Sequence, residues 1–439
     1  MAEIFPTCKL GEVASIKSGF AFKSRDMGIE GCPVIKIGNI NPPNVDIYNV
    51  ERVPFDIVKS STRIEKFLLE EGDALVAMTG ATVGKLGRFP KTSEAYYLNQ
   101  RVGKLFLNKP DQANYDFLYY VLSQKKYVEQ IFTSADGSAQ ANVSGGQIEA
   151  FKIPLPPLAE QIAIASVLGT LDDKIENNRR MNETLEEMAR AIFKSWFVDF
   201  DPVHAKAAGN TPAHMDAETT VLFPNSFDDD GLPVGWINKT LGDFIEIQNG
   251  YAFKSKDWTD EGIPVVKIGS VKPSIVDLSN CSFVSAEVAE QKRNFQLRVG
   301  DILIGLTGYV GEVGRVPPAD KMPMLNQRVG RVVFKRESFE PFVYAAMRLP
   351  EFKSFAESQS HGSAQANVST KQLQEYPVVV ADNLLIEKFN ALLESYFEKI
   401  LTNSAENQTL AKLCDTLLPK LMSGEIRVKD AKCEVEAAI

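Results

Sequence analysis

The segment Asn41-Pro42-Pro43-Asn44 is the part of this chain closest to a catalytic motif. Enzymes that methylate the amino group of adenine use Asn-Pro-Pro followed by an aromatic residue, which holds the flipped base and stacks on its ring. Here Asn44 replaces the aromatic residue, and no glycine-rich cofactor loop precedes the segment. We therefore expect a turn at this position and no methyl transfer by this chain.

The other residue types offer little for catalysis or metal binding. Residues 79–84 and 307–311 are rich in glycine but lack the Lys-Ser/Thr pair of a phosphate-binding loop. The three histidines lie far from the five scattered cysteines, so the sequence indicates neither a zinc site nor a disulfide framework. We expect reduced cysteines, no bound metal and no active site.

Length and charge leave DNA binding open. The 439 residues can form two to four domains, with no apolar run of the ~18 residues that span a membrane and no signal peptide, so we expect a cytoplasmic protein. Of the net charge of −9, residues 158–233 contribute −8 and residues 382–439 contribute −3. Residues 1–157 and 234–381 each carry +1, and a near-neutral domain can still have a basic face.

The chain contains an internal duplication. The octapeptide Gly-Ser-Ala-Gln-Ala-Asn-Val-Ser occurs twice, and the first repeated block has 16 identities in 31 aligned positions. Two copies of one unit can present two similar surfaces to two similar ligands. The repeated blocks are residues 10–40 with 241–271, 72–103 with 300–330, and 137–144 with 362–369.

Each copy has the pattern of a mixed α/β domain followed by one long helix. In the first copy, short β-branched or aromatic runs bounded by Gly, Pro and Asn predict strands, and residues 113–132 have helical periodicity. The predicted strands are residues 33–40, 74–79 and 98–107.

The end of each octapeptide has the spacing of a helix N-terminus. Ser144 with Gln147, and Ser369 with Gln372, fit a capping box, in which the serine hydroxyl accepts from the third helical amide and the glutamine reaches back. We interpret the octapeptide as a structural corner and prefer this to a direct functional role.

Residues 158–197 and 383–422 form two long helical stretches, interrupted only by Gly169 and Pro419. Apolar residues recur in each at the three-four spacing of a coiled coil. The first seam is Ile164, Leu168, Leu171, Ile175, Asn178, Asn182, Leu185, Ala189, Ile192 and Trp196, and the second is Phe389, Leu393, Tyr396, Ile400, Asn403, Asn407, Leu410, Cys414, Leu417 and Leu421.

Two copies related by a pseudo-twofold axis must pair these helices antiparallel. The symmetric register places Asn178 opposite Asn407 and Asn182 opposite Asn403. Buried Asn pairs cost stability but penalise slipped registers. The alternative is that these side chains face solvent and the seam is shifted. Helices of this length would form a strut about 60 Å long.

Two copies, each a recognition-like domain followed by a long helix, resemble the specificity subunit of type I restriction-modification enzymes. The resemblance covers essentially the whole chain, and its strength lies in the order of the motifs. They are Thr-Gly-Ala-Thr-Val-Gly at 79–84, Leu-Asn-Gln-Arg-Val-Gly at 98–103 and 325–330, the two octapeptides, Pro-Leu-Pro-Pro-Leu-Ala-Glu-Gln at 154–161, Trp-Phe-Val-Asp-Phe-Asp-Pro at 196–202 and Leu-Pro-Val-Gly-Trp at 232–236.

The resemblance implies an α/β (α+β) fold with two repeated target-recognition domains, each followed by a long helix, the two helices forming an antiparallel coiled coil with pseudo-twofold symmetry. The expected segments are recognition domain 1 (1–157), a central helix (158–198), a partly ordered linker (199–233), recognition domain 2 (234–381), a distal helix (382–424) and a C-terminal tail (425–439) that is loose from Lys429.

It also implies a division of labour. Each recognition domain would read one half of a split double-stranded DNA target, and the helix pair would set the gap between the half-sites. Two methyltransferase subunits carrying S-adenosylmethionine would dock on the helices and methylate adenine, and a motor-nuclease subunit would join them for restriction. The chain itself would be non-catalytic. The similarity of the first blocks further suggests half-sites that share bases.

Comparison of the two copies distinguishes candidate phosphate contacts from candidate base-reading residues. Matched cations suit sequence-independent phosphate contacts, with surface solvation or an internal ion pair as the alternative; they are Lys23, Lys36, Arg101, Lys254, Lys267 and Arg328. Base readers should lie where the copies diverge, at 41–70 against 272–298 and at 104–136 against 331–361. The candidates are Asn44, Tyr48, Asn49, Arg52, Lys272, Lys292, Arg293 and Asn294.

Other interpretations remain open. A two-headed DNA-binding regulator without a methyltransferase would have solvated helices, whereas a partner platform predicts exposed apolar residues there, such as Phe193, Phe197 and Phe200. A scaffold that binds only proteins, and a self-sufficient methyltransferase, have less support in the sequence.

Overall fold

The structure is a computed structural model that describes residues 5–59, 62–135, 141–279, 281–360 and 366–439. The chain divides into two compact units. The first unit holds the chain up to residue 173 together with residues 410–439, and the second unit holds residues 174–409. Each unit therefore combines one globular copy with parts of both long helices.

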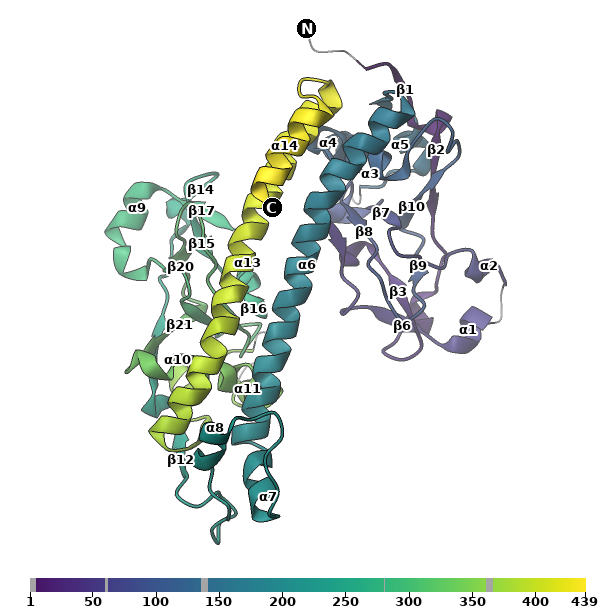
Figure 1. The fold of residues 1–439 in the computed structure, drawn as a ribbon. Coiled ribbons are helices and arrows are strands. Elements are labelled where there is room, and N and C mark those ends of the chain that lie inside the picture. Colours follow the sequence, from purple (N-terminus) through teal and green to yellow (C-terminus); the bar gives the residue numbers. More distant parts are fainter. Residues whose placement is uncertain (1–4, 60–61, 136–140, 280, 361–365) are drawn as a thin grey trace. The chain divides into compact units, whose positions relative to one another are not determined.

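The first unit is built on a six-stranded sheet in the order β2-β10-β7-β8-β5-β4 (Figure 1). The pairs are antiparallel except β5 with β8, which are parallel. A second sheet, β6-β3-β9, and the pair β1-β11 complete the unit. The strands are β1 (Thr7–Lys9), β2 (Ala14–Ser18), β3 (Cys32–Ile35), β4 (Ile40–Asn41), β5 (Asn44–Val45), β6 (Glu51–Val53), β7 (Ala74–Ala77), β8 (Leu86–Arg88), β9 (Tyr97–Leu98), β10 (Val102–Leu107) and β11 (Lys152–Pro154).

The second unit repeats this topology. Its main sheet has the order β13-β21-β18-β19-β16, which matches β2-β10-β7-β8-β5, so the sheet confirms the duplication predicted from the sequence. A sheet β14-β17-β15-β20 and the pair β12-β22 accompany it. The strands are β12 (Ile237–Thr240), β13 (Ile245–Asn249), β14 (Trp258–Thr259), β15 (Ile263–Val266), β16 (Ser274–Ile275), β17 (Ser282–Val284), β18 (Ile302–Gly305), β19 (Val313–Arg315), β20 (Met324–Leu325), β21 (Val329–Phe334) and β22 (Pro377–Val380).

Two of the three predicted strands are interrupted. The predicted strand 33–40 contains a 3-10 turn at Ile37–Asn39, and the predicted strand 98–107 contains the loop between β9 and β10. In both cases the apolar residues on either side of the break are buried. The pattern of apolar and polar residues in the sequence therefore could not reveal the turn. The interruptions place Lys36 and Arg101 at strand ends.

Short helices flank the sheets. The predicted helix 113–132 is two helices, because Gln124 has an extended backbone (φ −61°, ψ 139°) and its side-chain amide donates to Val121 O at 3.3 Å. The helices of the two globular parts are α1 (Phe55–Lys59), α2 (Thr62–Glu65), α3 (Tyr115–Ser123), α4 (Lys125–Thr133), α5 (Gly145–Glu149), α9 (Ala286–Gln291), α10 (Glu340–Met347), α11 (Pro350–Ser358) and α12 (Thr370–Gln374).

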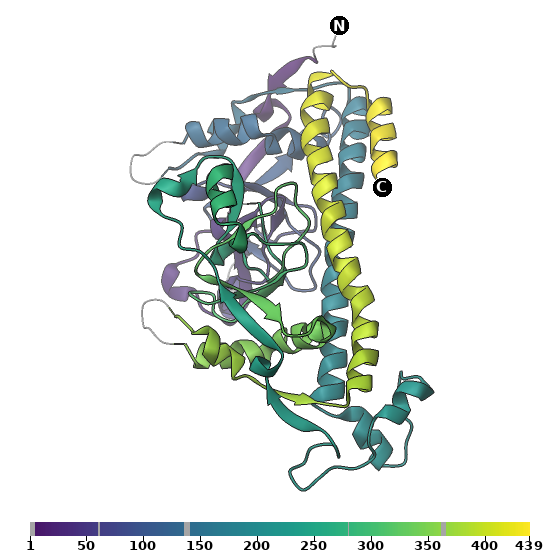
Figure 2. The same cartoon turned by 90° about the vertical axis from the view of Figure 1, so that its left-hand side faces the viewer.

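The two long helices are α6 (Leu158–Phe197) and α13 (Asn383–Ser423), as predicted (Figure 2). Neither Gly169 nor Pro419 ends its helix, because burial of the apolar seam outweighs their low helix propensity. Seam residues such as Leu171 in the first unit and Leu393 in the second are fully buried.

The connecting segments are more ordered than the sequence indicates. Within residues 199–233 the chain forms α7 (Asp201–Ala207) and α8 (Ala217–Leu222), and buries Val203 and Phe223. The prediction of a loose C-terminal tail is wrong, because α14 (Val428–Ala438) packs Ala431 and Val435 into the first unit. These two residues are one helical turn apart and form a narrow apolar stripe.

Candidate nucleic-acid interface

An exposed arginine ends the loop between β9 and β10 in the first unit. Gln100 N donates to Phe20 O at 2.8 Å, and Val102 N donates to Asn99 O at 3.0 Å. The side chain of Asn99 is buried, and its oxygen accepts from Arg101 N at 3.3 Å. A fixed backbone therefore presents the exposed cation of Arg101.

The second unit builds the same loop between β20 and β21. Gln327 N donates to Tyr251 O at 3.0 Å, and Val329 N donates to Asn326 O at 3.0 Å. The buried side chain of Asn326 accepts from Arg328 N at 3.4 Å, and Arg328 is exposed. The repeated segment Leu-Asn-Gln-Arg-Val-Gly thus conserves one backbone geometry around an exposed arginine in both copies.

One residue in each unit connects the arginine loop to the octapeptide. Met78 N donates to Arg101 O at 3.0 Å, and Met78 O accepts from Val143 N at 2.9 Å. Leu306 makes the same two hydrogen bonds in the second unit, at 3.1 and 3.0 Å. The described end of each octapeptide therefore supports the arginine loop, which agrees with its interpretation as a structural corner.

Both predicted capping boxes are confirmed. Ser144 Oγ accepts from Gln147 N at 3.3 Å, and Gln147 Oε1 accepts from Ser144 N at 2.8 Å. The corresponding distances for Ser369 and Gln372 are 3.2 and 3.1 Å. Helices α5 and α12 begin at these caps. The first four residues of each octapeptide lie outside the described residues.

The candidate phosphate contacts fall into two groups. Lys23 and Lys254 are exposed at the starts of matching 3-10 turns, and the two arginines are exposed as well. These four side chains keep the character expected of sequence-independent anchors.

The other two candidates are engaged within their own domains. Lys36 Nζ lies 2.6 Å from the carboxylate of Glu51. Lys267 Nζ lies 2.7 Å from Ser282 Oγ and 3.9 Å from the ring centroid of Trp258. Both lysines are half-buried, so the internal contact left open in the sequence describes them better than a phosphate contact.

The first set of candidate base readers is also mixed. Tyr48 is 79% exposed, Asn49 is exposed, and Asn44 is half-buried in β5. Arg52 Nη2 donates to Glu94 Oε2 at 3.0 Å, and this hydrogen bond lowers the pKa of the Glu94 carboxyl. Arg52 therefore stabilises its own domain and is the weakest of the four candidates.

In the second unit the candidates surround a short helix and a turn. Lys272, Arg293 and Asn294 are exposed, whereas Lys292 is half-buried with its Nζ 4.8 Å from the ring centroid of Tyr251. Arg293 lies 3.7 Å from a carboxylate one turn earlier in α9, and both side chains are largely exposed. Such a surface pair is weak and leaves the arginine accessible.

Tyr309 is a further exposed aromatic residue that was not among the candidates from the sequence. This side chain is 61% exposed in the turn after β18, and Lys272 Nζ lies 5.7 Å from its ring centroid. Gly308 N donates to Ala366 O at 2.8 Å, which ties the turn to the octapeptide. Alignment of the two Thr-Gly turns would have revealed this residue, because Thr-Gly is followed by Ala81 in the first copy and by Tyr309 in the second.

Two asparagine layers join the long helices in the second unit. Asn178 Nδ2 donates to Asn407 Oδ1 at 2.9 Å, and Asn403 Nδ2 donates to Asn182 Oδ1 at 2.8 Å. These are the pairs that the symmetric antiparallel register predicts. Glu406 accepts from Asn178 at 2.7 Å and forms an ion pair with Lys174 at 3.2 Å.

The predicted exposure of Phe193 and Phe197 is wrong. Each is 2% exposed, and both contact Phe342 of α10 and Phe389 of α13 at centroid distances of 5.0–5.8 Å. This end of α6 packs on the globular part of the second unit as well as on α13, so a second stripe beside the seam is buried. Phe200 is half-buried, and the three phenylalanines line a cavity of about 320 Å³ with residues of α10 and β22.

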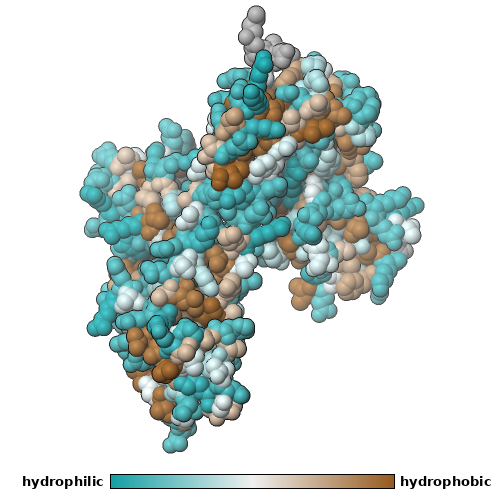
Figure 3. Space-filling view, in the orientation of Figure 1, coloured by the Kyte–Doolittle hydropathy of each residue, from teal (hydrophilic) through white to brown (hydrophobic). Residues whose placement is uncertain are grey.

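The exposed apolar side chains of α6 in the second unit are instead Met181 and Met188, at 44% and 43% exposure. Figure 3 shows a mainly hydrophilic face on which hydrophobic patches are set apart from one another.

The described part of the chain contains no helix that is long and apolar enough to cross a bilayer. In the same residues, no group of three His, Cys, Asp or Glu side chains is arranged to bind a metal ion.

Comparisons with known proteins give a consistent result. The family model of the type I restriction modification DNA specificity domain matches residues 4–187 and 233–382. The chain is 27% identical over 358 residues to the type I restriction enzyme HindI specificity subunit of Haemophilus influenzae, covering 71% of this chain and 77% of that protein. It is 23% identical over 437 residues to the EcoBI specificity subunit of Escherichia coli, covering 95% of this chain and 85% of that protein.

A solved structure agrees in fold. The type I restriction-modification S subunit from M. genitalium is similar with a TM-score of 0.50 at 19% sequence identity, covering 95% of this chain and 96% of that one.

Proposed function

Since this chain belongs to the type I restriction-modification DNA specificity family, with two recognition domains, we propose that each domain binds one half of a bipartite double-stranded DNA target. The observation that carries this proposal is the duplicated arginine loop. In both units an exposed arginine stands on a hydrogen-bonded loop that the octapeptide supports. Two equivalent cationic sites on one chain suit a ligand with two similar halves.

Anchoring and reading are assigned to different side chains. Arg101 and Arg328, with Lys23 and Lys254, contact phosphates, because matched cations on a common scaffold are independent of base sequence. Base reading falls to exposed side chains that differ between the copies. These are Tyr48 and Asn49 in the first unit, and Lys272, Arg293, Asn294 and Tyr309 in the second.

The helix pair sets the gap between the half-sites. Two readers on one face of a duplex must lie about one helical turn apart, roughly 34–36 Å. Paired helices can hold such a distance, whereas a flexible linker cannot. The asparagine layers support this role, because a shifted register would leave buried amides without partners.

Two methyltransferase subunits, which bind S-adenosylmethionine, dock on the helix pair and methylate adenine, and a motor-nuclease subunit joins them for restriction. With Phe193 and Phe197 in the core, Met181 and Met188 are the better docking residues. Methionine adapts its shape to a partner surface, and both side chains lie on the same helix two turns apart. Glutamate at both positions should abolish co-purification with the methyltransferase and leave DNA binding by the chain intact.

The direct test is to express the chain with its methyltransferase partner and to map methylated adenines across a genome. We expect one bipartite motif with a single gap length, and half-sites that share bases if the similarity of the two copies extends to their ligands. A contiguous motif would overturn the two-reader proposal. A chain that binds DNA but neither co-purifies with a methyltransferase nor supports methylation would be a two-headed regulator instead.

A further inference from the structure

In each unit, a tyrosine hydroxyl from the recognition domain donates to a carboxylate on α6. Tyr120 OH lies 2.6 Å from Asp172 Oδ2 in the first unit, and Tyr344 OH lies 2.8 Å from Glu186 Oε1 in the second. Both tyrosines are buried, at 6% and 0% exposure. The two carboxylates belong to one continuous helix.

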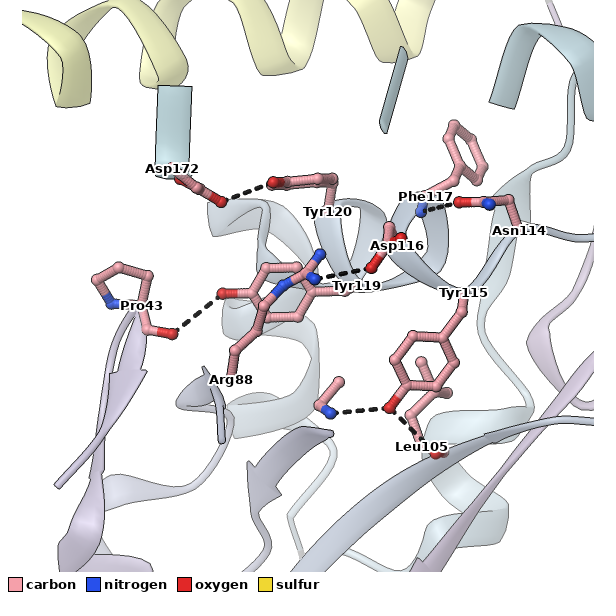
Figure 4. A network of polar contacts seen from close by, with 11 residues as sticks. Pro43, Arg88, Leu105, Asn114, Tyr115, Asp116, Phe117, Tyr119, Tyr120 and Asp172 are labelled. Carbon is pink, nitrogen blue, oxygen red and sulfur yellow. Dashed lines mark hydrogen bonds and ion pairs between the residues drawn. The ribbon is translucent and has the colours of Figure 1, made fainter. Parts of the chain in front are cut away.

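Figure 4 shows how the contact continues in the first unit. The guanidinium of Arg88 lies 4.2 Å from the ring centroid of Tyr119 and 2.7 Å from Asp116 Oδ1. Tyr119 OH in turn donates to Pro43 O at 3.2 Å. The hydroxyls of these adjacent tyrosines of α3 therefore have different partners, Asp172 on α6 for Tyr120 and the turn that precedes β5 for Tyr119.

That turn leads directly into β5, the strand that begins with Asn44. Arg88 N donates to Pro43 O at 2.8 Å, and Arg88 pairs with Asn44 in the parallel ladder of β8 and β5. Asn44 is one of the candidate base readers. A chain of direct contacts thus runs from Asp172 on α6 to the strand that carries Asn44.

The second unit contains an equivalent cluster. Arg315 occupies the position of Arg88 in its sheet, with its guanidinium 4.3 Å from the ring centroid of Tyr344 and 2.8 Å from Glu340 Oε1. Arg348 adds a second donor to Glu186, at 3.1 Å. The neighbouring strand β16 pairs with Arg315 and follows the turn that contains Lys272.

Duplication alone does not explain the two contacts. The residue that matches Tyr120 in the second copy is Ala345, and the residue that matches Tyr344 in the first is Tyr119, whose hydroxyl donates to Pro43 O and not to a carboxylate of α6. The two domains reach carboxylates at different positions of α6 with tyrosines at different positions of their own helices. Apolar packing would need no hydroxyl at either site, whereas a hydrogen bond fixes direction as well as proximity.

The pKa shifts of the two tyrosines agree with their role as hydrogen-bond donors. Burial and the nearby carboxylate raise the pKa of Tyr120 far above its usual range, so the phenol keeps its proton and donates it. Burial and the nearby carboxylate do the same to the pKa of Tyr344.

We propose that the Tyr120–Asp172 and Tyr344–Glu186 contacts are positioning locks that fix the direction of each recognition domain on α6, and that they thereby make the protein reject DNA targets with a wrong gap length. This inference rests on the proposed function. The locks touch no DNA and add nothing to the reading of bases. Their loss relaxes the gap requirement and leaves the half-site sequences unchanged.

The test uses the complex with its methyltransferase and duplexes that carry the mapped target with its native gap, or with a gap one base pair shorter or longer. The lock variants are Tyr120→Phe, Tyr344→Phe and the double variant, each of which removes only hydroxyl oxygen. We expect the ratio of methylation rates between native and altered gaps to fall about tenfold in each single variant, the scale of one lost buried hydrogen bond, and further in the double variant.

Tyr127→Phe is the matched control. Tyr127 is 4% exposed and donates to Lys152 O at 3.0 Å, inside the recognition domain and not to a residue of α6. Asp172→Asn should preserve the native ratio, because the amide oxygen still accepts from Tyr120. Melting curves show whether each variant is folded.

The outcomes are distinct. The lock assignment would be overturned if the double variant had the same ratio of methylation rates between native and altered gaps as Tyr127→Phe. A change in the preferred bases would overturn it as well. If the unaltered complex itself showed no bipartite target, the proposed function would fail, and the lock inference with it.

Discussion

We expect replacement of both Asn182 and Asn403 by leucine to stabilise the second unit, and neither single replacement to do so. Asn403 is fully buried, donates to Asn182 Oδ1 at 2.8 Å, and its own oxygen accepts from none of the described residues. Asn182 donates to Ile400 O at 3.3 Å, a long hydrogen bond. This layer therefore buries polar groups with incomplete compensation.

The magnitude follows from these contacts. The double replacement removes the unpaired oxygen, which costs roughly 1–3 kcal/mol, and gives up two hydrogen bonds of about 1 kcal/mol each. Two buried leucines contribute about 1.5–3 kcal/mol each, less roughly 1–3 kcal/mol for the strain of fitting branched side chains. The net stabilisation is about 2 kcal/mol. Asn182→Leu leaves Asn403 Nδ2 unpaired, and Asn403→Leu leaves Asn182 Oδ1 unpaired, which offsets the gain of either single replacement.

The assay is a double-mutant cycle on the full chain. The stability of each variant is measured by thermal unfolding and by hydrogen exchange of the amides around Asn403. Asn177→Leu, at an exposed position of α6, controls for the substitution itself. We expect the double variant to exceed the sum of the single variants by about 2 kcal/mol. Additive effects, or a double variant less stable than the original chain, would mean that this asparagine pair does not destabilise the second unit.

Three further predictions concern charge and caps. Burial raises the pKa of Asp172, so the folded state binds its proton more tightly than the unfolded chain. Asp172→Asn should therefore raise the melting temperature at pH 7, and this advantage should shrink as the pH falls through the raised folded pKa toward the ordinary value of 3.8. Arg101→Ala and Arg328→Ala should each weaken DNA binding for all sequences alike and reduce the slope of log K against log salt by about 0.9, measured by titration of labelled duplex at several salt concentrations. Ser144→Ala should destabilise the first unit by about 1 kcal/mol through loss of the helix cap, measured by chemical denaturation, and Ser369→Ala should do the same to the second.

Each of these has an outcome that would count against it. A constant difference between Asp172→Asn and the original chain from pH 7 to pH 4 would mean that the carboxyl does not titrate abnormally. An arginine variant that weakened binding to one half-site sequence more than to another would identify a base reader instead of a phosphate anchor. Unchanged denaturation of the serine variants would show that the capping boxes contribute little.

Features that depend on hydrophobic period and local spacing could be predicted from the sequence alone. The duplication, the two long helices, their antiparallel asparagine pairs and both capping boxes follow from patterns in the chain, and the structure contains each of them. A heptad fixes which face of a helix is apolar, and a serine three residues before a glutamine fixes a helix start, without help from distant residues.

Tertiary structure decided everything that depends on a neighbour distant in the chain. Phe193 is buried because α10 and α13 cover a stripe that a two-helix seam would leave exposed. Lys36 is engaged because another strand brings Glu51 beside it. Tyr120 meets Asp172 because the sheet and α6 pack together, and no spacing in the sequence encodes that distance. Burial and hydrogen-bond partners are properties of the assembled fold, so the roles of individual polar side chains emerge only with it.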